Sequence, residues 1–383
     1  MNLPRLFLSL STSVLLLLCG LAISPALASD GEAADWPEWR GPDQNGIAAG
    51  ALPSSLSPGD ATSVIDLPGM STSTPIVVGN QIILTSQVGK APIAASRDGG
   101  GGTGDSQVTF LVLSYSLDQG KELWRHEILS DGVLPSVHMK HNLASPSVAS
   151  DGERLIAWFG TGQIVSLSLE GEVEWQRHLG REISPFEVRW AHGSSPVLLD
   201  DRLFLLCDHT PESYLLAVDK SSGKTLWKAD RGAGRRSYTT PLVIPHGDGM
   251  ALVVNSNERI DAYDPETGEV LWYVGQPVRV PVSTPVWHDG VLYTSRGYRS
   301  GPYMAVRTGG SGDVNASHLL WRHATGAPYV SSLLYHDGLV YLATETGVAS
   351  AVDASTGETV WRQRLGGNFS ASPFALDGKV CLL

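Results

Sequence analysis

One short pattern recurs along this chain and constrains its fold more than any other feature. The full form reads Ala-x-Asp, then a glycine, then a tryptophan four residues after the glycine, as in Ala217–Trp227, Ala262–Trp272 and Ala351–Trp361. Successive tryptophans of the pattern lie 51, 52, 45, 49 and 40 residues apart. A period of this length indicates that one structural unit is repeated along the chain. The glycine and tryptophan pairs are Gly120/Trp124, Gly171/Trp175, Gly223/Trp227, Gly268/Trp272 and Gly357/Trp361, whereas Trp321 has Ser317 in place of the glycine.

Each repeat contains the signals of four short strands. A Ser/Thr-Pro step opens an apolar strand, a turn such as Asp289-Gly290 leads into a second strand, a third ends in Ala-x-Asp, and the Trp strand is the fourth. Asp-Gly between apolar runs is a strong hairpin signal. The pattern predicts an all-β fold, a β-propeller of four-stranded antiparallel blades, with six full blades and part of a seventh. The steps are Thr74-Pro75, Ser145-Pro146, Ser195-Pro196, Thr240-Pro241, Thr284-Pro285, Ser372-Pro373 and the weaker Ser332-Leu333.

The repeated residues have a structural interpretation. Glycine takes the positive φ that a tight turn needs, and tryptophan covers a large apolar area while its N–H reaches a backbone acceptor. We therefore expect Trp124, Trp175, Trp227, Trp272, Trp321 and Trp361 to dock against neighbouring blades rather than to contact a ligand.

These motifs resemble the tryptophan-docking repeats of pyrroloquinoline-quinone-type propellers, which include quinoprotein dehydrogenases and an outer-membrane assembly lipoprotein. The segments Trp36–Gly46 and Gly366–Pro373 are similar to those of exported planctomycete-type propellers. The resemblance implies eight blades, so we expect the chain to be incomplete after Cys381-Leu382-Leu383. Val64–Leu67 is expected to supply an outer strand to the last blade.

The first residues read as a secretory signal peptide at 1–28. Arg5 is followed by the apolar run Val14–Leu18 and by the small residues Ala26–Ala28, which predict cleavage after Ala28. An N-terminal extension at 29–61 and a propeller at 62–383 would follow, in the periplasm or outside the cell, with no transmembrane span. The mature chain would carry a net charge of −13, which argues against nucleic acid as a partner. Cys207 and Cys381 are too few for a disulfide-based fold, and the sequence leaves their state open.

Basic residues gather in the segments that link each outer strand to the next inner strand. These segments, near 125–144, 176–194, 228–239, 273–283, 322–331 and 362–371, hold 13 Lys/Arg and 5 Asp/Glu. Five of the 13 follow a tryptophan and are expected in the outer strands instead: Arg125, Arg177, Lys228, Arg322 and Arg362. The remaining basic residues are interpreted either as solvated charges of loops or as a binding site for an anionic group. The candidate residues of the anion site are Lys140, Arg181, Arg189, Arg235, Arg236, Arg279 and Arg364.

Histidines supply the remaining candidates. His138 and His141 lie three residues apart, and Trp190 and His192 follow in the next linking segment. No cysteine or acid at ligand spacing accompanies them, so we expect loop-ordering polar contacts and no metal. Asn368 is expected to serve in a turn, with ligand contact as the alternative. Gly99–Gly104 fits a dinucleotide motif only formally, because no strand and helix flank it.

Two functions are compatible with the features of the sequence. The first is a non-catalytic, exported binding or scaffold protein that presents a face at its channel to an envelope or secreted protein, or to a small anionic ligand. It needs no cofactor. The alternative, implied by the resemblance, is an oxidoreductase that uses pyrroloquinoline quinone and calcium. The adjacent cysteine pair of many such enzymes is absent from this sequence, and no aspartate outside the repeat turns matches their base.

Overall fold

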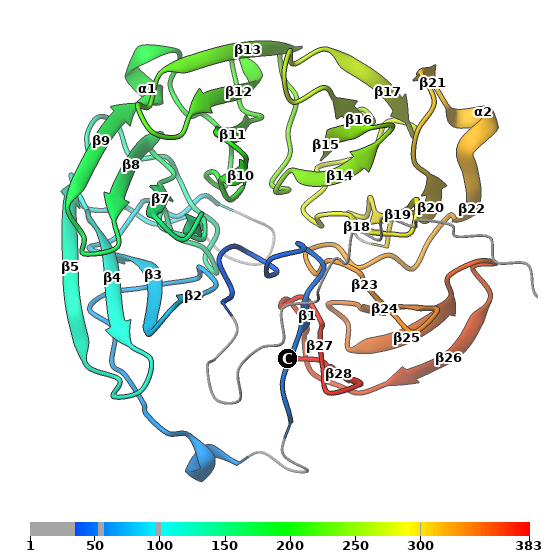
Figure 1. Cartoon of the computed structure of the whole chain (residues 1–383), viewed down its shortest axis with the longest axis horizontal. Coiled ribbons are helices and arrows are strands. Elements are labelled where there is room, and N and C mark those ends of the chain that lie inside the picture. Colours follow the sequence, from blue (N-terminus) through cyan, green and yellow to red (C-terminus); the bar gives the residue numbers. More distant parts are fainter. Residues whose placement is uncertain (1–34, 53–56, 96–100, 299) are drawn as a thin grey trace, which may run out of the picture. The chain divides into compact units, whose positions relative to one another are not determined.

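Seven β-sheets follow one another along the described chain, and their first strands face a common centre (Figure 1). The computed structural model describes residues 35–52, 57–95, 101–298 and 300–383. Asp35–Leu383 form one compact unit. The expected signal peptide and the start of Gly99–Gly104 lie outside the described residues. The all-β propeller prediction is therefore confirmed, with six blades of at least four strands and a seventh sheet of three.

Blades 1 to 3 are antiparallel sheets whose strands follow chain order from the centre outwards. Blade 1 contains β2 (Ile76–Val78), β3 (Gln81–Val88), β4 (Thr109–Ser116) and β5 (Glu122–Leu129). Blade 2 contains β6 (Ala149–Ser150), β7 (Arg154–Trp158), β8 (Gln163–Ser168) and β9 (Val173–His178). Blade 3 contains β10 (Val197–Leu199), β11 (Arg202–Cys207), β12 (Ser213–Asp219) and β13 (Thr225–Gly232).

Blades 4 to 6 repeat this order, with one addition to blade 4. Blade 4 contains β14 (Leu242–His246), β15 (Gly249–Asn255), β16 (Ile260–Tyr263) and β17 (Val270–Val274). Blade 5 contains β18 (Val286–His288), β19 (Val291–Ser295), β20 (Tyr303–Arg307) and β22 (Leu319–His323). Blade 6 contains β23 (Leu334–His336), β24 (Leu339–Ala343), β25 (Val348–Asp353) and β26 (Thr359–Arg364). The addition to blade 4 is β21 (Gly312–Asp313), which pairs in parallel with β17.

The seventh sheet joins the two ends of the described chain. β27 (Phe374–Leu376) and β28 (Lys379–Cys381) form a hairpin, and β1 (Ile47–Ala48) pairs in parallel with β27. The described residues also contain three short helices, η1 (Pro58–Asp60), α1 (Leu179–Glu182) and α2 (Asn315–His318).

Burial explains why the middle strands are almost entirely apolar. Successive blades pack face to face, so both faces of strands such as β11 and β12, which lie between blades 2 and 4, are buried. The outer strands meet solvent at the rim, and β5 accordingly alternates between exposed and partly buried residues. Each of the six full blades has a bulge beside its tryptophan, for example between Ala217 and Val218 opposite Trp227.

A belt of hydroxyl groups joins the inner ends of successive sheets. The Thr74 backbone N–H donates to Ser147 Oγ at 2.9 Å, which links blades 1 and 2. The equivalent bond recurs at each following boundary, with lengths of 2.9 to 3.0 Å. Most of these hydroxyls belong to the Ser/Thr-Pro steps, so the step both opens a strand and fastens it to the preceding sheet. The belt also includes the hydroxyl groups of Ser195, Thr240, Thr284, Ser332 and Ser372.

Four tryptophans dock on the glycine turn of the next blade. The Trp175 indole N–H donates to the Lys220 carbonyl at 2.9 Å, and a Cβ on Gly223 would lie 2.8 Å from its ring. Only a glycine allows this approach. Trp124, Trp227 and Trp321 make the same contacts with the turns at Gly171, Gly268 and Gly357.

The other two tryptophans depart from the expected docking. Trp272 is fully buried, but its indole N–H has no partner, because the longer connection carrying β21 and Val314 covers it instead of a glycine turn. This connection explains why Ser317 stands where the other repeats have a glycine, because no tryptophan approaches that position. Trp361 is 38% exposed and docks on no described turn.

The segment 61–67 does not form the outer strand that we expected. Val64–Leu67 is irregular, and Ile65 and Leu67 pack against blade 1. Ser63 lies where a tryptophan would dock, because a Cβ on Gly120 would come within 2.7 Å of the Ser63 Cβ. Apolar packing on blade 1 therefore replaces strand pairing in this segment.

The segment Trp36–Ala48 crosses the middle of the ring (Figure 1). Trp36 pairs with Val77 of blade 1, and β1 pairs with β27. Between these points, the buried Arg40 guanidinium donates to the Leu333 carbonyl at 2.9 Å and to the Pro373 carbonyl at 3.4 Å. Gln44 Oε1 accepts the Val243 N–H at 2.9 Å. The segment therefore connects the first, fourth, sixth and seventh sheets at the centre of the ring.

Candidate functional site

The candidate site lies on the face where each outer strand leads into the next inner strand. Because strands alternate in direction, the turns between second and third strands lie on the same face. We call it the connection face; its linking segments are 130–148, 179–196, 233–241, 275–285, 324–333 and 365–373, and its turns include 208–212, 256–259, 296–302 and 344–347. Arg125, Arg177, Lys228, Arg322 and Arg362 lie within outer strands, as expected.

The histidines of two linking segments, His141 and His192, meet. His141 bonds to Ser145 Oγ at 2.7 Å through Nδ1 and to the His192 carbonyl at 3.3 Å through Nε2. The His192 ring stacks on Trp158 with centroids 4.2 Å apart. Burial lowers the pKa of His141 to about 4 and that of His192 to about 3, so both rings are neutral at pH 7. The described residues contain no group of three or more His, Cys, Asp or Glu side chains placed to hold a metal.

Trp190 lies next to this histidine pair. The His138 ring meets it edge-on at 6.0 Å, and the Arg189 guanidinium lies 5.2 Å from its centroid. Arg189 also donates to the Ala95 carbonyl at 3.0 Å, which joins the long turn of blade 1 to the linking segment of blade 2. The structure thus brings His138, Trp190 and Arg189 together.

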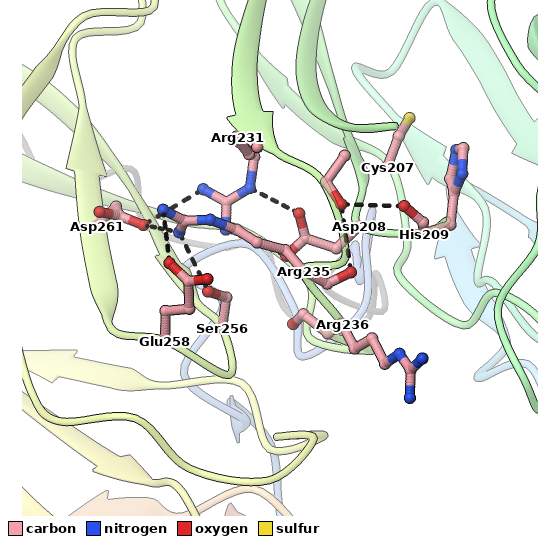
Figure 2. A network of polar contacts seen from close by, with 12 residues as sticks. Cys207, Asp208, His209, Arg231, Arg235, Arg236, Ser256, Glu258 and Asp261 are labelled. Carbon is pink, nitrogen blue, oxygen red and sulfur yellow. Dashed lines mark hydrogen bonds and ion pairs between the residues drawn. The ribbon is translucent and has the colours of Figure 1, made fainter. Parts of the chain in front are cut away.

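Arg235 belongs to a buried ionic network between blades 3 and 4 (Figure 2). Arg235 Nη1 donates to Asp261 at 2.6 Å, and Arg231 donates to Asp208 at 2.7 and 3.1 Å. Arg231 Nη1 also lies 3.5 Å from Asp261. The side chains of Arg231, Asp208 and Asp261 have no solvent exposure. A buried pair of this kind is costly to break, because removal of one partner leaves the other charge unpaired.

The charges of the network stabilise one another. Burial acts to lower the pKa of Arg231, but the nearby charges, Asp208 first, outweigh it and raise that pKa. Arg235 also reaches the exposed Glu258 at 3.5 Å. Arg236, the next residue, points away from the network and is exposed (Figure 2).

Four exposed cations of the linking segments form no ion pair with the described part of the chain. They are Lys140, Arg189, Arg236 and Arg279. Arg279 lies over the Tyr298 ring at 4.7 Å. Several acids of this face are already engaged, since Asp131 pairs with Arg181 and Glu212 pairs with Lys228. The linking segments alone hold six Lys/Arg and three Asp/Glu, so they carry more basic than acidic residues.

The last two candidates lie apart from the others. Asn368 is exposed, and no contact joins it to another candidate residue. Arg364 donates to the Thr346 carbonyl at 3.1 Å at the edge of blade 6. Neither belongs to the histidine pair or to the ionic network.

Asp208, Arg231 and Asp261, the centre of the network, were not among the site residues expected from the sequence. One signal for Asp261 was present: it precedes Ala262 in the repeat, where the other complete repeats have Leu216 or Ser350. An acid in a strand that is otherwise apolar indicates a buried partner. No comparable signal pairs Asp208 with Arg231, which lie 23 residues apart.

Comparison with known proteins finds similarity over much of the chain. The sequence profile of a family described as outer membrane protein assembly factor BamB matches residues 108–314 and 310–383. The protein of that name from Yersinia pestis is 24% identical over 265 residues, which are 66% of this chain and 61% of the relative. A quinoprotein ethanol dehydrogenase from Pseudomonas aeruginosa is 26% identical over 148 residues, 32% of this chain and 20% of the enzyme.

A solved structure shares the fold. BamB from Moraxella catarrhalis superposes with a TM-score of 0.51 at 14% identity, over 72% of this chain and 76% of that one. The chain spans about six-tenths of the length of the first curated relatives that it matches. Among the described residues, no helix has the length and apolar character of a membrane span.

Proposed function

Because this chain belongs to the family of the outer membrane protein assembly factor BamB, we propose that it is a binding scaffold of the cell envelope whose connection face holds an acidic segment of an envelope protein. The observation that carries this proposal is the set of four exposed, unpaired cations Lys140, Arg189, Arg236 and Arg279. Arginine forms charge-assisted, bidentate bonds with carboxylates. Aromatic side chains beside two of these arginines add contact area.

The filled centre of the ring supports binding on the face rather than within a channel. Arg40 and Gln44 form hydrogen bonds with backbone groups at the inner ends of blade 4, blade 6 and the seventh sheet. A partner at the connection face needs no movement of this segment. The rigid blades beneath would present the cations in a fixed arrangement, which lowers the entropy cost of binding.

The described residues do not fit the alternative, a calcium-bound quinone. Calcium needs six to eight oxygen ligands, usually with several carboxylates. Asp208 and Asp261, the two fully buried aspartates of the connection face, are both bonded to arginine. We therefore derive no oxidation step. Dye reduction that depends on added pyrroloquinoline quinone, calcium and an alcohol would reverse this conclusion.

We also propose that the protein is exported and cleaved after Ala28. The apolar segment before that residue and the outer-membrane relatives support the proposal. Mass spectrometry of the exported protein is expected to find Ser29 at the amino terminus. A lipid on Cys19 would contradict cleavage after Ala28.

Site-specific cross-linking tests the binding surface. A photoreactive residue at position 236 or 279 is expected to capture an envelope protein through an acidic segment, identified by mass spectrometry. Binding of that purified protein should weaken at least tenfold in the double variant Arg236→Glu and Arg279→Glu. The matched control replaces Lys121 and Lys224 with Glu, since both are exposed and lie on the opposite turns. Equal affinity of the two double variants would overturn the proposal.

A further inference from the structure

Four aromatic side chains follow one another across the connection face. Trp190 lies in the linking segment after blade 2, Tyr238 in the one after blade 3 and Tyr329 in the one after blade 5. Tyr298 belongs to the turn between β19 and β20. We call these four residues the aromatic arc. All four are partly exposed, so the arc borders solvent at four separate connections of the ring.

Contacts within the aromatic arc hold its members in one cluster. The Tyr238 hydroxyl is hydrogen-bonded to the Trp190 backbone. The Tyr298 and Tyr329 rings meet edge-on, with centroids 5.0 Å apart. Burial raises the pKa of Tyr329, to which nearby Tyr238 also contributes, and burial raises the pKa of Tyr238 to about 12. Both hydroxyls are therefore protonated at neutral pH and can donate a hydrogen bond.

Two of the exposed arginines flank the first half of the arc. Arg189 lies over Trp190, as described above. The charges of Arg236 and Arg189 both act to lower the pKa of Tyr238, against the larger effect of burial, so both guanidinium groups lie near its hydroxyl. A carboxylate bound by either arginine would therefore lie beside an aromatic ring.

The second half of the arc repeats this arrangement. Arg279 lies over the Tyr298 ring, and its charge also acts on Tyr329. Glu345 is an acid near Tyr329, but its carboxylate already accepts the N–H groups of Tyr329 and Val330 at 2.6 and 2.7 Å. Cations and aromatic rings are therefore interleaved across this part of the face.

We propose that the acidic segment bound by the connection face carries an aromatic side chain directly next to its carboxylates, and that this ring packs on the aromatic arc. The inference rests on the proposed function, because it requires that the exposed arginines bind carboxylates. An aromatic pair is favourable beyond the apolar area that it buries. A packed ring also excludes water from the neighbouring ion pair, and tyrosine, tryptophan and arginine are the side chains that contribute most to binding at protein interfaces.

Three labelled peptides of equal charge test this proposal on the full protein. They are octapeptides that alternate aspartate with tyrosine, leucine or glycine, and fluorescence anisotropy measures their dissociation constants at one salt concentration. The tyrosine peptide is expected to bind at least about tenfold more tightly than the glycine peptide, and more tightly than the leucine peptide. Equal affinity of the leucine and tyrosine peptides would overturn the aromatic preference.

Variants assign the preference to the aromatic arc. The double variant Tyr298→Ala and Tyr329→Ala should bind the tyrosine peptide no more tightly than the glycine peptide. Trp361→Ala, at an exposed aromatic residue of β26 outside the linking segments, should keep the preference. If the double variant does not fold, Tyr298→Leu serves instead and should reduce the preference. An undiminished preference in either folded variant contradicts the proposal.

The same peptides separate this inference from the proposed function. The double variant Arg236→Glu and Arg279→Glu should weaken the binding of all three peptides. If it does so while the three peptides bind the wild-type protein equally, the proposed function stands and the aromatic arc takes no part in binding. Absence of binding by all three peptides would contradict both.

Discussion

The Thr284 hydroxyl accepts the backbone N–H of Thr240 at 2.9 Å, across the boundary between blades 4 and 5. Thr284 in turn donates its own N–H to Ser332 Oγ at 3.0 Å on the next boundary. One residue therefore fastens three sheets. This chain of hydroxyl bonds explains why a serine or threonine begins nearly every inner strand.

Replacement of Thr284 with valine should destabilise the ring. The valine keeps the shape but leaves the buried Thr240 N–H without an acceptor, which costs about 1–3 kcal/mol. Thr284→Ser keeps the hydroxyl and should cost less. Denaturant unfolding measures both variants, and equal stability of the valine and serine proteins would show that the bond contributes nothing.

The docking of Trp175 on Gly223 should make that glycine far more sensitive than others with the same backbone. Gly223→Ala places a Cβ 2.8 Å from the indole, in addition to the strain of a φ of +72°. Gly290 has a φ of +78° and open space around it, so Gly290→Ala carries only the strain, about 1–2 kcal/mol. We expect Gly223→Ala to lose at least about 3 kcal/mol of unfolding free energy. Similar losses for both would rule out the clash.

Arg40 should stabilise the ring from its centre. Arg40→Met removes the donors to the Leu333 and Pro373 carbonyls and leaves these buried groups unsatisfied, so we expect a loss of about 2–3 kcal/mol. Hydrogen exchange should speed up first in β23 and β27, which those residues precede. Exchange that speeds up equally in all blades would contradict a local role, and Arg307→Met provides the control.

The buried histidines should make the protein sensitive to acid. The folded-state pKa values of His192 and His141 lie near 3 and 4, below the value of about 6.5 in an unfolded chain. Between pH 6.5 and 4 the unfolded state therefore binds more protons, and the unfolding free energy falls as pH falls. The unfolding free energy of His192→Gln should decline less steeply over this range. Parallel pH profiles for wild type and His192→Gln would contradict this assignment.

The sequence by itself determined the blade, because its period, its hairpin turns and its glycine and tryptophan pairs depend on contacts within one repeat or between adjacent repeats. The same local logic placed Arg125, Arg177, Lys228, Arg322 and Arg362 in outer strands. The prediction of an outer strand at Val64–Leu67 was wrong, because these residues pack on blade 1 instead of pairing with a strand.

Only the tertiary structure decided how distant polar groups meet. Arg40 bonds to a carbonyl 333 residues away, Asp208 pairs with Arg231, and Asp261 pairs with Arg235. A repeat shows which strand a residue occupies, but not which charges converge when sheets close around a centre. That convergence depends on the angle between blades and on the path of the linking segments. Both arise from packing over the whole ring, which no local pattern records.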